Sequence, residues 1–264
     1  MSDIWEIYAL RYATRANRTR SESFLFDDDH SAPHPLDYYV WVLKNGTRSI
    51  LVDTGFDAAE GKLRNRPIFQ SPAEMLTDFG LPASDIDTVI VTHMHYDHAG
   101  SLHDFRHAKL YVQPREIEYV TGPCMCHGAL RQPFTGDHVI EMVRSLYLGN
   151  VEFCEGSREI APGVEVHLIG GHTRGQQCVR VRTRRGWVVL ASDSSHFYEN
   201  YRAGKPFPIV VDMEDTLRGY DLLRRLADSD DHIIPGHDPL TREWYPMIDG
   251  GSENIVLLHA DPKV

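Results

Sequence analysis

Long hydrophobic runs are absent from this sequence: no stretch approaches the roughly 18 consecutive apolar residues of a transmembrane helix. The first residues also lack the basic start and apolar core of a secretory signal. Cysteine is scarce, and the four cysteines are too irregularly spaced for a disulfide framework. We therefore expect a chain that stays out of membranes and resides in the cytoplasm.

Positive charge is also in short supply. The 264 residues include 27 Lys and Arg against 38 Asp and Glu, a formal net charge of −11. Such a surface repels phosphate backbones, which argues against nucleic-acid binding and against a nuclease. The remaining composition, 42% hydrophobic and 25% charged, is that of a globular protein with a sizeable core.

The first half of the chain reads as a hairpin followed by a helix and a buried strand. Asn45-Gly46 is a strong turn signal, and the strand expected over 48–53 ends in an aspartate. A capping box that begins at Ser71 opens a short helix, and the β-branched run 88–92 is typical of a buried strand. A histidine follows that strand at once.

The second half repeats this order faintly. A turn at 184–186 leads to a strand over 187–192, then to a helix at about 213–227 and a last strand near 232–235. An aspartate follows the first of these strands and a histidine the last. Two related β-rich units with outer helices predict an α/β fold of two β-sheets packed face to face, with matching strand ends converging on one edge.

No linker or low-complexity tract divides the chain. We therefore expect one domain over residues 1–264. Its least regular part is a polar, partly helical stretch at about 114–150 that is expected to border the active site.

Three imidazoles and a carboxylate lie within six residues, directly after the strand at 88–92. Alternate residues of an extended segment point the same way, so His93 and His95 can face one metal ion. A turn would then carry Asp97 and His98 toward a second position. Imidazole and carboxylate suit zinc, and also iron, manganese or cobalt.

Three further ligand candidates follow strands in the second half. His172 lies in a Gly-Gly-His turn, Asp193 follows the strand 187–192, and His237 follows the last strand. A buried acid without a partner would be costly, and a carboxylate at Asp193 could bridge two cations. Each of the three could be structural when taken alone, but together they complete two sets of metal ligands.

The succession His-x-His-x-Asp-His, Gly-His, strand–Asp and Gly-His resembles the metallo-β-lactamase superfamily over about residues 39–239. The resemblance implies an αββα sandwich and two divalent metal ions. It assigns the ligands as two groups joined by Asp193 and a bridging hydroxide: His93, His95 and His172 for one metal, and Asp97, His98 and His237 for the other. Asp53 matches an aspartate that orients a ligand through a hydrogen bond.

Within the superfamily the sequence is most similar to the N-acyl homoserine lactonases, a quorum-quenching group. Common zinc β-lactamases usually carry cysteine where Asp193 stands, and oxygen-reducing diiron members usually carry glutamate where His95 stands. The similarity implies that the bridging hydroxide opens a small-molecule lactone, either an acyl homoserine lactone or a catabolic lactone. Asp97 would pass a proton to the leaving alkoxide.

Several alternatives remain open at this stage. The same fold could act on a thioester, a cyclic amide or a phosphodiester, or the chain could bind metal without catalysis. The complete ligand set argues against the last of these. The sequence does not identify the native metal or the substrate, and it leaves open whether the chain forms a homodimer.

One position departs from the lactonase pattern. Where those enzymes typically carry a tyrosine, three residues after the bridging aspartate, this chain has His196. An imidazole can also donate to an oxyanion, so we expect His196 to contact substrate and to take part in catalysis, with Tyr198 as a second candidate. Met125 and Phe134 are expected to offer apolar contacts from a loop over the site. The spacing of Cys124, Cys126 and His127 fits no common zinc module.

Overall fold

The computed structural model describes residues 3–46, 48–248 and 250–263. Seven strands build the first sheet: β1 (Glu6–Arg15), β2 (Leu36–Asn45), β3 (Arg48–Val52), β4 (Thr88–Ile90), β5 (Lys109–Val112), β6 (Val151–Phe153) and β12 (Ile255–Leu257). Five build the second: β7 (Ser157–Ala161), β8 (Val164–Leu168), β9 (Gln177–Thr183), β10 (Gly186–Ser192) and β11 (Ile233–Pro235). Their spatial orders are β12-β1-β2-β3-β4-β5-β6 and β11-β10-β9-β8-β7.

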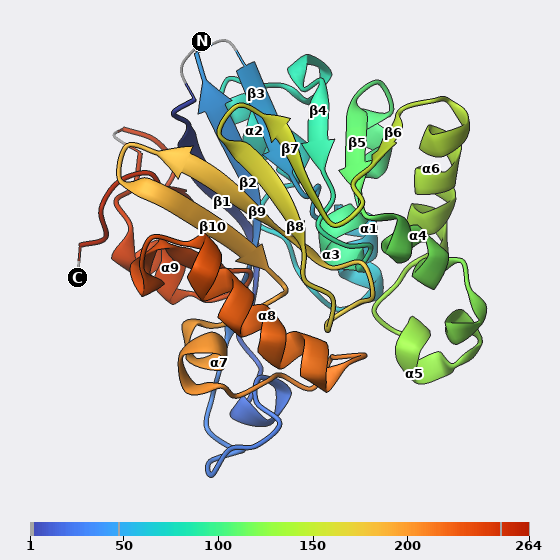
Figure 1. The fold of residues 1–264 in the computed structure, drawn as a ribbon, viewed down its shortest axis with the longest axis vertical. Helices are drawn as coiled ribbons and strands as arrows, with labels where there is room; N and C mark the ends of the chain where they lie inside the picture. The colour runs from blue at the N-terminus through green and yellow to red at the C-terminus, as the bar shows by residue number, and fades with distance from the viewer. Residues whose placement is uncertain (1–2, 47, 249, 264) are drawn as a thin grey trace.

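The helices lie outside the two sheets (Figure 1). They are α1 (Ala58–Leu63), α2 (Pro72–Asp78), α3 (Tyr96–Ala99), α4 (Pro114–Val120), α5 (Gly128–Arg131), α6 (Gly136–Tyr147), α7 (Tyr198–Ala203), α8 (Met213–Leu226) and α9 (Leu240–Trp244). Short 3-10 turns are η1 (Arg20–Glu22), η2 (Ala83–Asp85), η3 (Leu102–Phe105), η4 (Pro123–Cys126) and η5 (Asp230–His232). No helix in the described residues is both long enough and apolar enough to cross a bilayer.

Strand β10 shows how the layers are held together. Val188 and Leu190 point into the core between the sheets, whereas Val189 and Ala191 point outward against α8. This alternation is the two-residue period of a strand with both faces buried. A separate core on the outer face of the first sheet packs against α2 and α6. The three cores confirm the predicted αββα sandwich.

The internal repeat is also present. In each half an antiparallel hairpin leads to a strand that pairs in parallel with the next one: Leu51 of β3 lies beside Val89 of β4, and Val189 of β10 beside Ile233 of β11. The carboxyl ends of parallel neighbours meet at one edge of a sheet, as the sequence predicted for both halves. That edge carries the candidate site.

Two strands escaped the sequence analysis. Both β7 and β12 are edge strands, and β7 is exposed at most of its positions. Edge strands need little apolar alternation because one side is unpaired, so the pattern that revealed the central strands is weak there. The stretch 114–150 is helical as predicted, although its expected loop is itself folded into η4 and α5.

Candidate metal centre

Sharp turns at the strand ends direct the candidate ligands into one place. Asp53 after β3 and Ser192 at the end of β10 have φ of 61° and 47°, a left-handed conformation that non-glycine residues adopt only at a cost of about 1 kcal/mol or more. Gly170 and Gly171 adopt φ of 77° and 79° just before His172. The chain therefore reverses where each strand delivers a polar side chain.

The seven predicted ligand residues converge from both sheets and are all buried. Three groups of described residues offer ligand atoms within 4.8 Å of one another, and one of them, Asp193, His196 and His237, shares members with the two others. Those two are His93, His95, His172 and Asp193, and Asp97, His98 and His237. These groups match the two sets of ligands that the sequence resemblance implied. Such a His/Asp cluster is suited to binding divalent metal ions.

Asp193 lies between the two groups. Its Oδ1 atom is 3.1 Å from Nε2 of His98 and 3.0 Å from Nε2 of His237. Its Oδ2 atom is 3.2 Å from Nε2 of His172 and 3.8 Å from Nε2 of His93. Its Oδ2 also lies 3.3 Å from Nε2 of His237, so this one carboxylate contacts ligand atoms of both groups.

Two of the imidazoles donate a hydrogen bond from Nδ1, the ring nitrogen that faces away from the cluster. Nδ1 of His172 donates to the carbonyl of Ile209 at 2.6 Å, and Nδ1 of His237 donates to the carbonyl of Asp37 at 2.8 Å. A carbonyl only accepts, so the proton of a neutral ring sits on Nδ1 and Nε2 presents its lone pair to the cluster. Metal-binding histidines are oriented in this way.

Buried atoms without hydrogen-bond partners supply a test of fit. They include Nε2 of His93, His98 and His172, together with Oδ1 of Asp193. Buried polar atoms are nearly always paired, and unpaired ones ask for an explanation such as an ion. Four orphaned donor or acceptor atoms aimed at one another fit divalent cations at this position.

Asp53 joins the segments that carry the candidate ligands in the two halves of the chain. Its carboxylate accepts hydrogen bonds from the backbone N and the hydroxyl of Thr92, both at 2.8 Å, and its Oδ2 lies 2.7 Å from Nδ1 of His98. The hydroxyl of Ser192 reaches the same Thr92 at 2.9 Å. Asp53 lies outside both ligand groups and beside His98, in keeping with the orienting role that the resemblance implies.

The sequence analysis missed Glu116, a buried carboxylate on α4. It accepts from the backbone N of Met94 at 2.8 Å, from the hydroxyl of Thr173 at 2.6 Å and from the backbone N of Gly175 at 3.0 Å. It thereby joins the loop of His93 and His95 to the loop of His172. No local motif identifies it, because all of its partners come from other elements.

Charge and burial set the protonation of the cluster. Burial, with the neighbouring His98 and His95, lowers the pKa of His93 well below its usual value, and burial with His172 does the same for His95. Burial alone would raise the pKa of Asp193, but His237 and His98 hold it well below its usual range. Burial would lower the pKa of His98 and of His237 as well, but Asp193 beside them raises both above the usual value. Metal binding would displace those protons, because neutral imidazoles and an ionised carboxylate are the forms that bind metal.

His196 stands on the wall of the site, as predicted. Its Nε2 lies 3.0 Å from Oδ2 of Asp193, and its ring stacks on Phe207 with centroids 3.6 Å apart. Tyr198 is turned the other way: its ring packs against Trp244 and its hydroxyl faces Thr241 at 3.4 Å. The structure therefore brings His196 to the site and leaves Tyr198 in the core beside α8.

The loop residues expected to touch substrate lie behind the wall. Phe134 packs edge-on against His95 at 4.5 Å, and Met125 packs on the core around the first sheet. The same segment instead presents Gln132 and Pro133 to the cavity. A short helix formed where an open loop was expected, which turned the apolar side chains inward. The groups of metal-ligand residues found in the described chain do not include Cys124, Cys126 or His127.

A cavity of about 490 Å³ opens directly over the cluster. Its floor contains His95, Asp97, His172, Asp193 and His237, and its wall contains His196, Tyr38, Tyr96, Leu36, Leu63, Ile209 and four arginines. The hydroxyls of Tyr38 and Tyr96 are 3.0 Å apart. The cavity is large enough for a small molecule that reaches the cluster.

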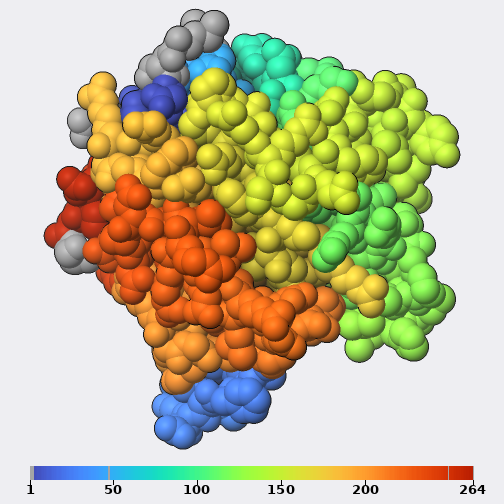
Figure 2. Space-filling model, in the orientation of Figure 1, coloured from blue at the N-terminus to red at the C-terminus, as the bar shows by residue number. Residues whose placement is uncertain are grey.

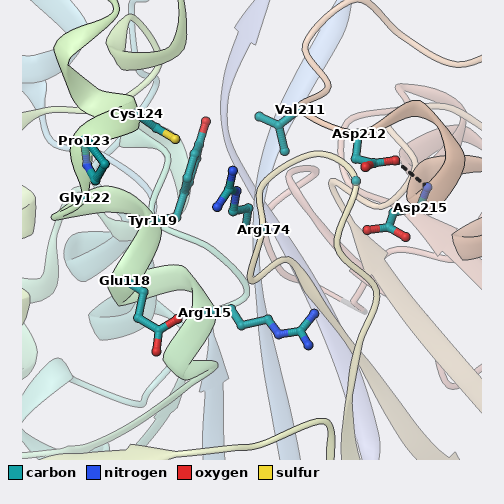
Figure 3. A pocket seen from close by; sticks show the side chains of 11 residues that line it. Arg115, Glu118, Tyr119, Gly122, Pro123, Cys124, Arg174, Val211, Asp212 and Asp215 are labelled. Carbon is teal, nitrogen blue, oxygen red and sulfur yellow. Dashed lines mark hydrogen bonds between the residues drawn. The ribbon is translucent and has the colours of Figure 1, made fainter.

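A second cavity, of about 450 Å³, lies on the other side of the Gly171 turn (Figure 3). In it Arg174 lies between Tyr119 and the start of α8, where Asp212 accepts a hydrogen bond from the backbone N of Asp215 at 2.9 Å. This cavity contains none of the clustered histidines. The chemistry therefore belongs to the first cavity.

Comparisons with known proteins agree with this geometry. Residues 35–237 match the model of the metallo-beta-lactamase superfamily. An N-acyl homoserine lactonase from Bacillus sp is 28% identical over 225 residues, which cover 77% of this chain and 82% of that protein. The solved structure of an N-acyl homoserine lactone hydrolase, with product N-hexanoyl-L-homoserine bound at its catalytic metal center, has a TM-score of 0.75 at 23% identity and covers 92% of this chain and 96% of that one. A dizinc quorum-quenching lactonase has a TM-score of 0.67 at 15% identity, with coverage of 97% and 95%.

Proposed function

Because the chain belongs to the metallo-β-lactamase superfamily, we propose that it is a hydrolase that opens a lactone ring at a centre of two divalent metal ions, zinc first among them. The position of Asp193 carries the proposal. Its Oδ1 lies 3.1 and 3.0 Å from Nε2 of His98 and His237, and its Oδ2 lies 3.2 and 3.3 Å from Nε2 of His172 and His237, so one carboxylate contacts ligands of both groups. A single metal ion would need only one of those groups.

The proposed ligands are His93, His95 and His172 on one side, Asp97, His98 and His237 on the other, and Asp193 shared between them. Bound there, two divalent cations would supply a hydroxide at neutral pH and would polarise the carbonyl of the substrate. Lactone opening adds the oxygen of water to the carbonyl carbon, breaks the ring C–O bond and returns a proton to the departing alkoxide.

Asp97 is our candidate for that last proton transfer. Its carboxylate lies on the cavity floor, with Oδ2 3.6 Å from Nε2 of His237, and it is 8% exposed, so a substrate can reach it. The hydroxyls of Tyr38 and Tyr96, from the wall of the same cavity, can donate to substrate oxygens above it. Asp97 would bind metal and move a proton, whereas the tyrosines would orient the substrate.

His196 has two roles in the proposal. Through Nε2 it orients Asp193, and its ring forms the cavity wall where a substrate carbonyl would lie. Burial lowers the pKa of His196 to about 3, so the neutral imidazole is the form present at neutral pH. We keep it as the residue that takes the place of the lactonase tyrosine.

The relatives support lactone chemistry in particular. Those with curated names include N-acyl homoserine lactonases at 25–28% identity, and one of the solved neighbours holds an acyl homoserine product at its metal centre. Similarity at that level supports the reaction class more strongly than the substrate. We therefore extend the proposal to lactone hydrolysis and leave the acyl homoserine group itself to the assay.

The test combines metal analysis with a substrate panel. We expect close to two zinc-type ions per chain and turnover of γ-lactones, with weak or no turnover of thioesters, cyclic amides and phosphodiesters. His172→Ala should lose metal and activity together, whereas His103→Ala, on a half-exposed side chain away from the cluster, should lose neither. A metal-free wild-type protein, or lactones inert beside an active thioester or phosphodiester, would contradict the proposal.

A further inference from the structure

The mouth of the active-site cavity is strongly basic. We define the mouth as Arg15, Arg18, Glu22, Arg64 and Arg66, which line the cavity above the floor. Four guanidinium groups and one carboxylate stand there, in a chain whose net charge is −11. The sign of the mouth is thus opposite to that of the molecule.

Not all of these arginines are free to bind a ligand. Arg64 forms an ion pair with Glu60 and donates to the carbonyls of Gln132 and Phe134, at 3.0 and 3.1 Å. Its role is to fasten α1 to the segment before α6. The guanidinium of Arg64 is therefore engaged within the protein and is not counted as free to bind a ligand.

Arg15 and Arg18 share a single carboxylate. Glu22 lies 2.6 Å from Arg15 Nη2 and 3.9 Å from Arg18 Nε. The side chain of Arg18 is only 4% exposed. Its Nη1 and Nη2 donate to the hydroxyl of Ser23 at 3.1 Å and the carbonyl of Glu22 at 2.7 Å, and its Nε has no hydrogen-bond partner among the described residues. Burial lowers the pKa of Arg18 to about 10, which reflects how poorly its charge is compensated.

Arg66 has no acidic partner within 4.0 Å in the described chain. It follows the end of α1, where Asn65 adopts φ of 55° and the backbone N of Arg66 bonds back to the carbonyl of Gly61 at 2.6 Å. This helix end fixes the position of Arg66. Its Nη1 donates to the carbonyls of Arg64 and Asn65, both at 3.0 Å, and its Nε is buried without a partner, which leaves Nη2 to donate to a ligand.

Three guanidiniums, of Arg15, Arg18 and Arg66, therefore face one carboxylate over the cluster. The second cavity has no such excess, because Arg115 and Arg174 stand there with Glu118, Asp212 and Asp215 (Figure 3). Of these two cavities, only the one over the metal-ligand cluster has more basic than acidic side chains at its mouth. The Nη2 of Arg66 can donate to a carboxylate, and a hydrogen bond between two charged groups is shorter and stronger than one between neutral groups.

The geometry points to a substrate that carries a free carboxylate apart from the bond that is cleaved, held by Arg66 with Arg18 behind it. This inference rests on the proposed function, since it specifies the lactone as a lactone carboxylate. Glu22 at the same mouth would oppose a dianion, which favours a carboxylate over a phosphate monoester. Acyl homoserine lactones carry no such group.

Paired substrates test the inference in the wild-type enzyme. They are γ-butyrolactones that bear a carboxylate on zero, one or two methylenes, each beside its uncharged carboxamide of the same size. We expect kcat/KM to favour at least one carboxylate about 10- to 100-fold, the range of a hydrogen-bonded charge, and to fall with added salt. Arg66→Gln should remove the preference by raising KM for the carboxylate, and Arg66→Lys should restore part of the preference. The control is Arg182→Gln, at an exposed arginine paired with Asp3, which should change nothing.

A binding measurement separates this inference from the proposed reaction. Glutarate titrated into the metal-loaded protein should bind about tenfold more weakly to Arg66→Gln than to wild type, whether or not any lactone is hydrolysed. If lactones prove inert but Arg66→Gln still binds glutarate more weakly than wild type, the proposed reaction is overturned and the carboxylate site is kept. Equal use of carboxylates and carboxamides, or glutarate affinity unchanged in folded, metal-loaded Arg66→Gln, would overturn the carboxylate site.

Discussion

The floor and the mouth of the active-site cavity are built in different ways. The floor comes from residues that directly follow buried strands of both sheets, and its imidazoles are held by carbonyls or carboxylates behind them. The mouth comes from the segments 15–36 and 63–66, which lie between strands and helices. The first of these segments projects at the foot of the molecule below α7 (Figures 1 and 2). The two sheets therefore set the floor, whereas connecting segments, which vary more readily among related proteins, set the mouth.

The largest predicted effect breaks the floor. Asp193→Asn keeps the shape of the side chain but removes the charge shared by the two ligand groups. Activity should fall on every substrate by more than the roughly 10- to 100-fold that loss of an outer hydrogen-bond partner costs, and bound metal should drop below two ions per chain. Elemental analysis and a lactone assay check this. Full metal content with near-normal turnover would show that Asp193 is no bridge.

His196→Ala should have the next largest effect. The one N–H of the neutral ring, at Nε2, donates to Asp193, so the substitution removes a partner that orients the proposed bridge, a loss that typically costs about 10- to 100-fold in activity. Metal content decides how the loss arises: retained metal with low turnover supports the wall position of His196, whereas lost metal would make it a ligand beside Asp193 and His237. Tyr198→Phe is the control, because its hydroxyl faces Thr241 inside the core. Wild-type turnover in His196→Ala would remove the residue from the proposal.

Glu116→Gln should weaken the floor without touching a ligand. An amide cannot accept from the backbone N of Met94 and from Thr173 and Gly175 together, so one buried donor loses its partner. We expect metal affinity to fall about 10- to 100-fold, measured by competition with a chelator. Glu118→Gln, on the exposed face of the same helix, should leave that affinity unchanged. Lower stability with unaltered metal affinity would limit Glu116 to a structural role.

The same contrast explains what the sequence could predict. Proposed metal ligands such as His93, Asp193 and His237 follow short apolar strands, and both the strand and the polar residue can be recognised from the local sequence. Glu116 is defined by hydrogen-bond partners distant in sequence, and Arg66 by lining the same cavity as Arg15 and Arg18, and no local pattern reveals either. Tyr198 and Phe134 had suitable chemistry, but packing against Trp244 and His95 turned them from the cavity. Side-chain direction in short helices depends on such contacts.

The smallest predicted effect concerns how the mouth is attached to the floor. His34 lies at the end of the mouth segment, with its ring against Phe24 and against Phe197, the residue after His196. Burial, reinforced by Arg20 and Arg18, lowers the pKa of His34 to about 4. The folded pKa is therefore below that of the unfolded chain, so the neutral ring stabilises the fold fully above about pH 6.5 and this contribution is lost as the pH falls toward 4. Because His34 is only half-buried, we expect a loss of about 1 kcal/mol between pH 7 and pH 5.

His34→Phe keeps the ring contacts and removes the titration. Urea unfolding of both proteins at pH 7 and pH 5, under the same metal conditions, should show a smaller loss of unfolding free energy in the variant by about that 1 kcal/mol. The histidines of the floor titrate in both proteins, so the difference between the two losses isolates His34. Equal losses would mean that protonation of His34 does not loosen the mouth segment from Phe197, and that other contacts hold the segment, among them the ion pairs Arg20–Glu199 and Lys205–Asp27.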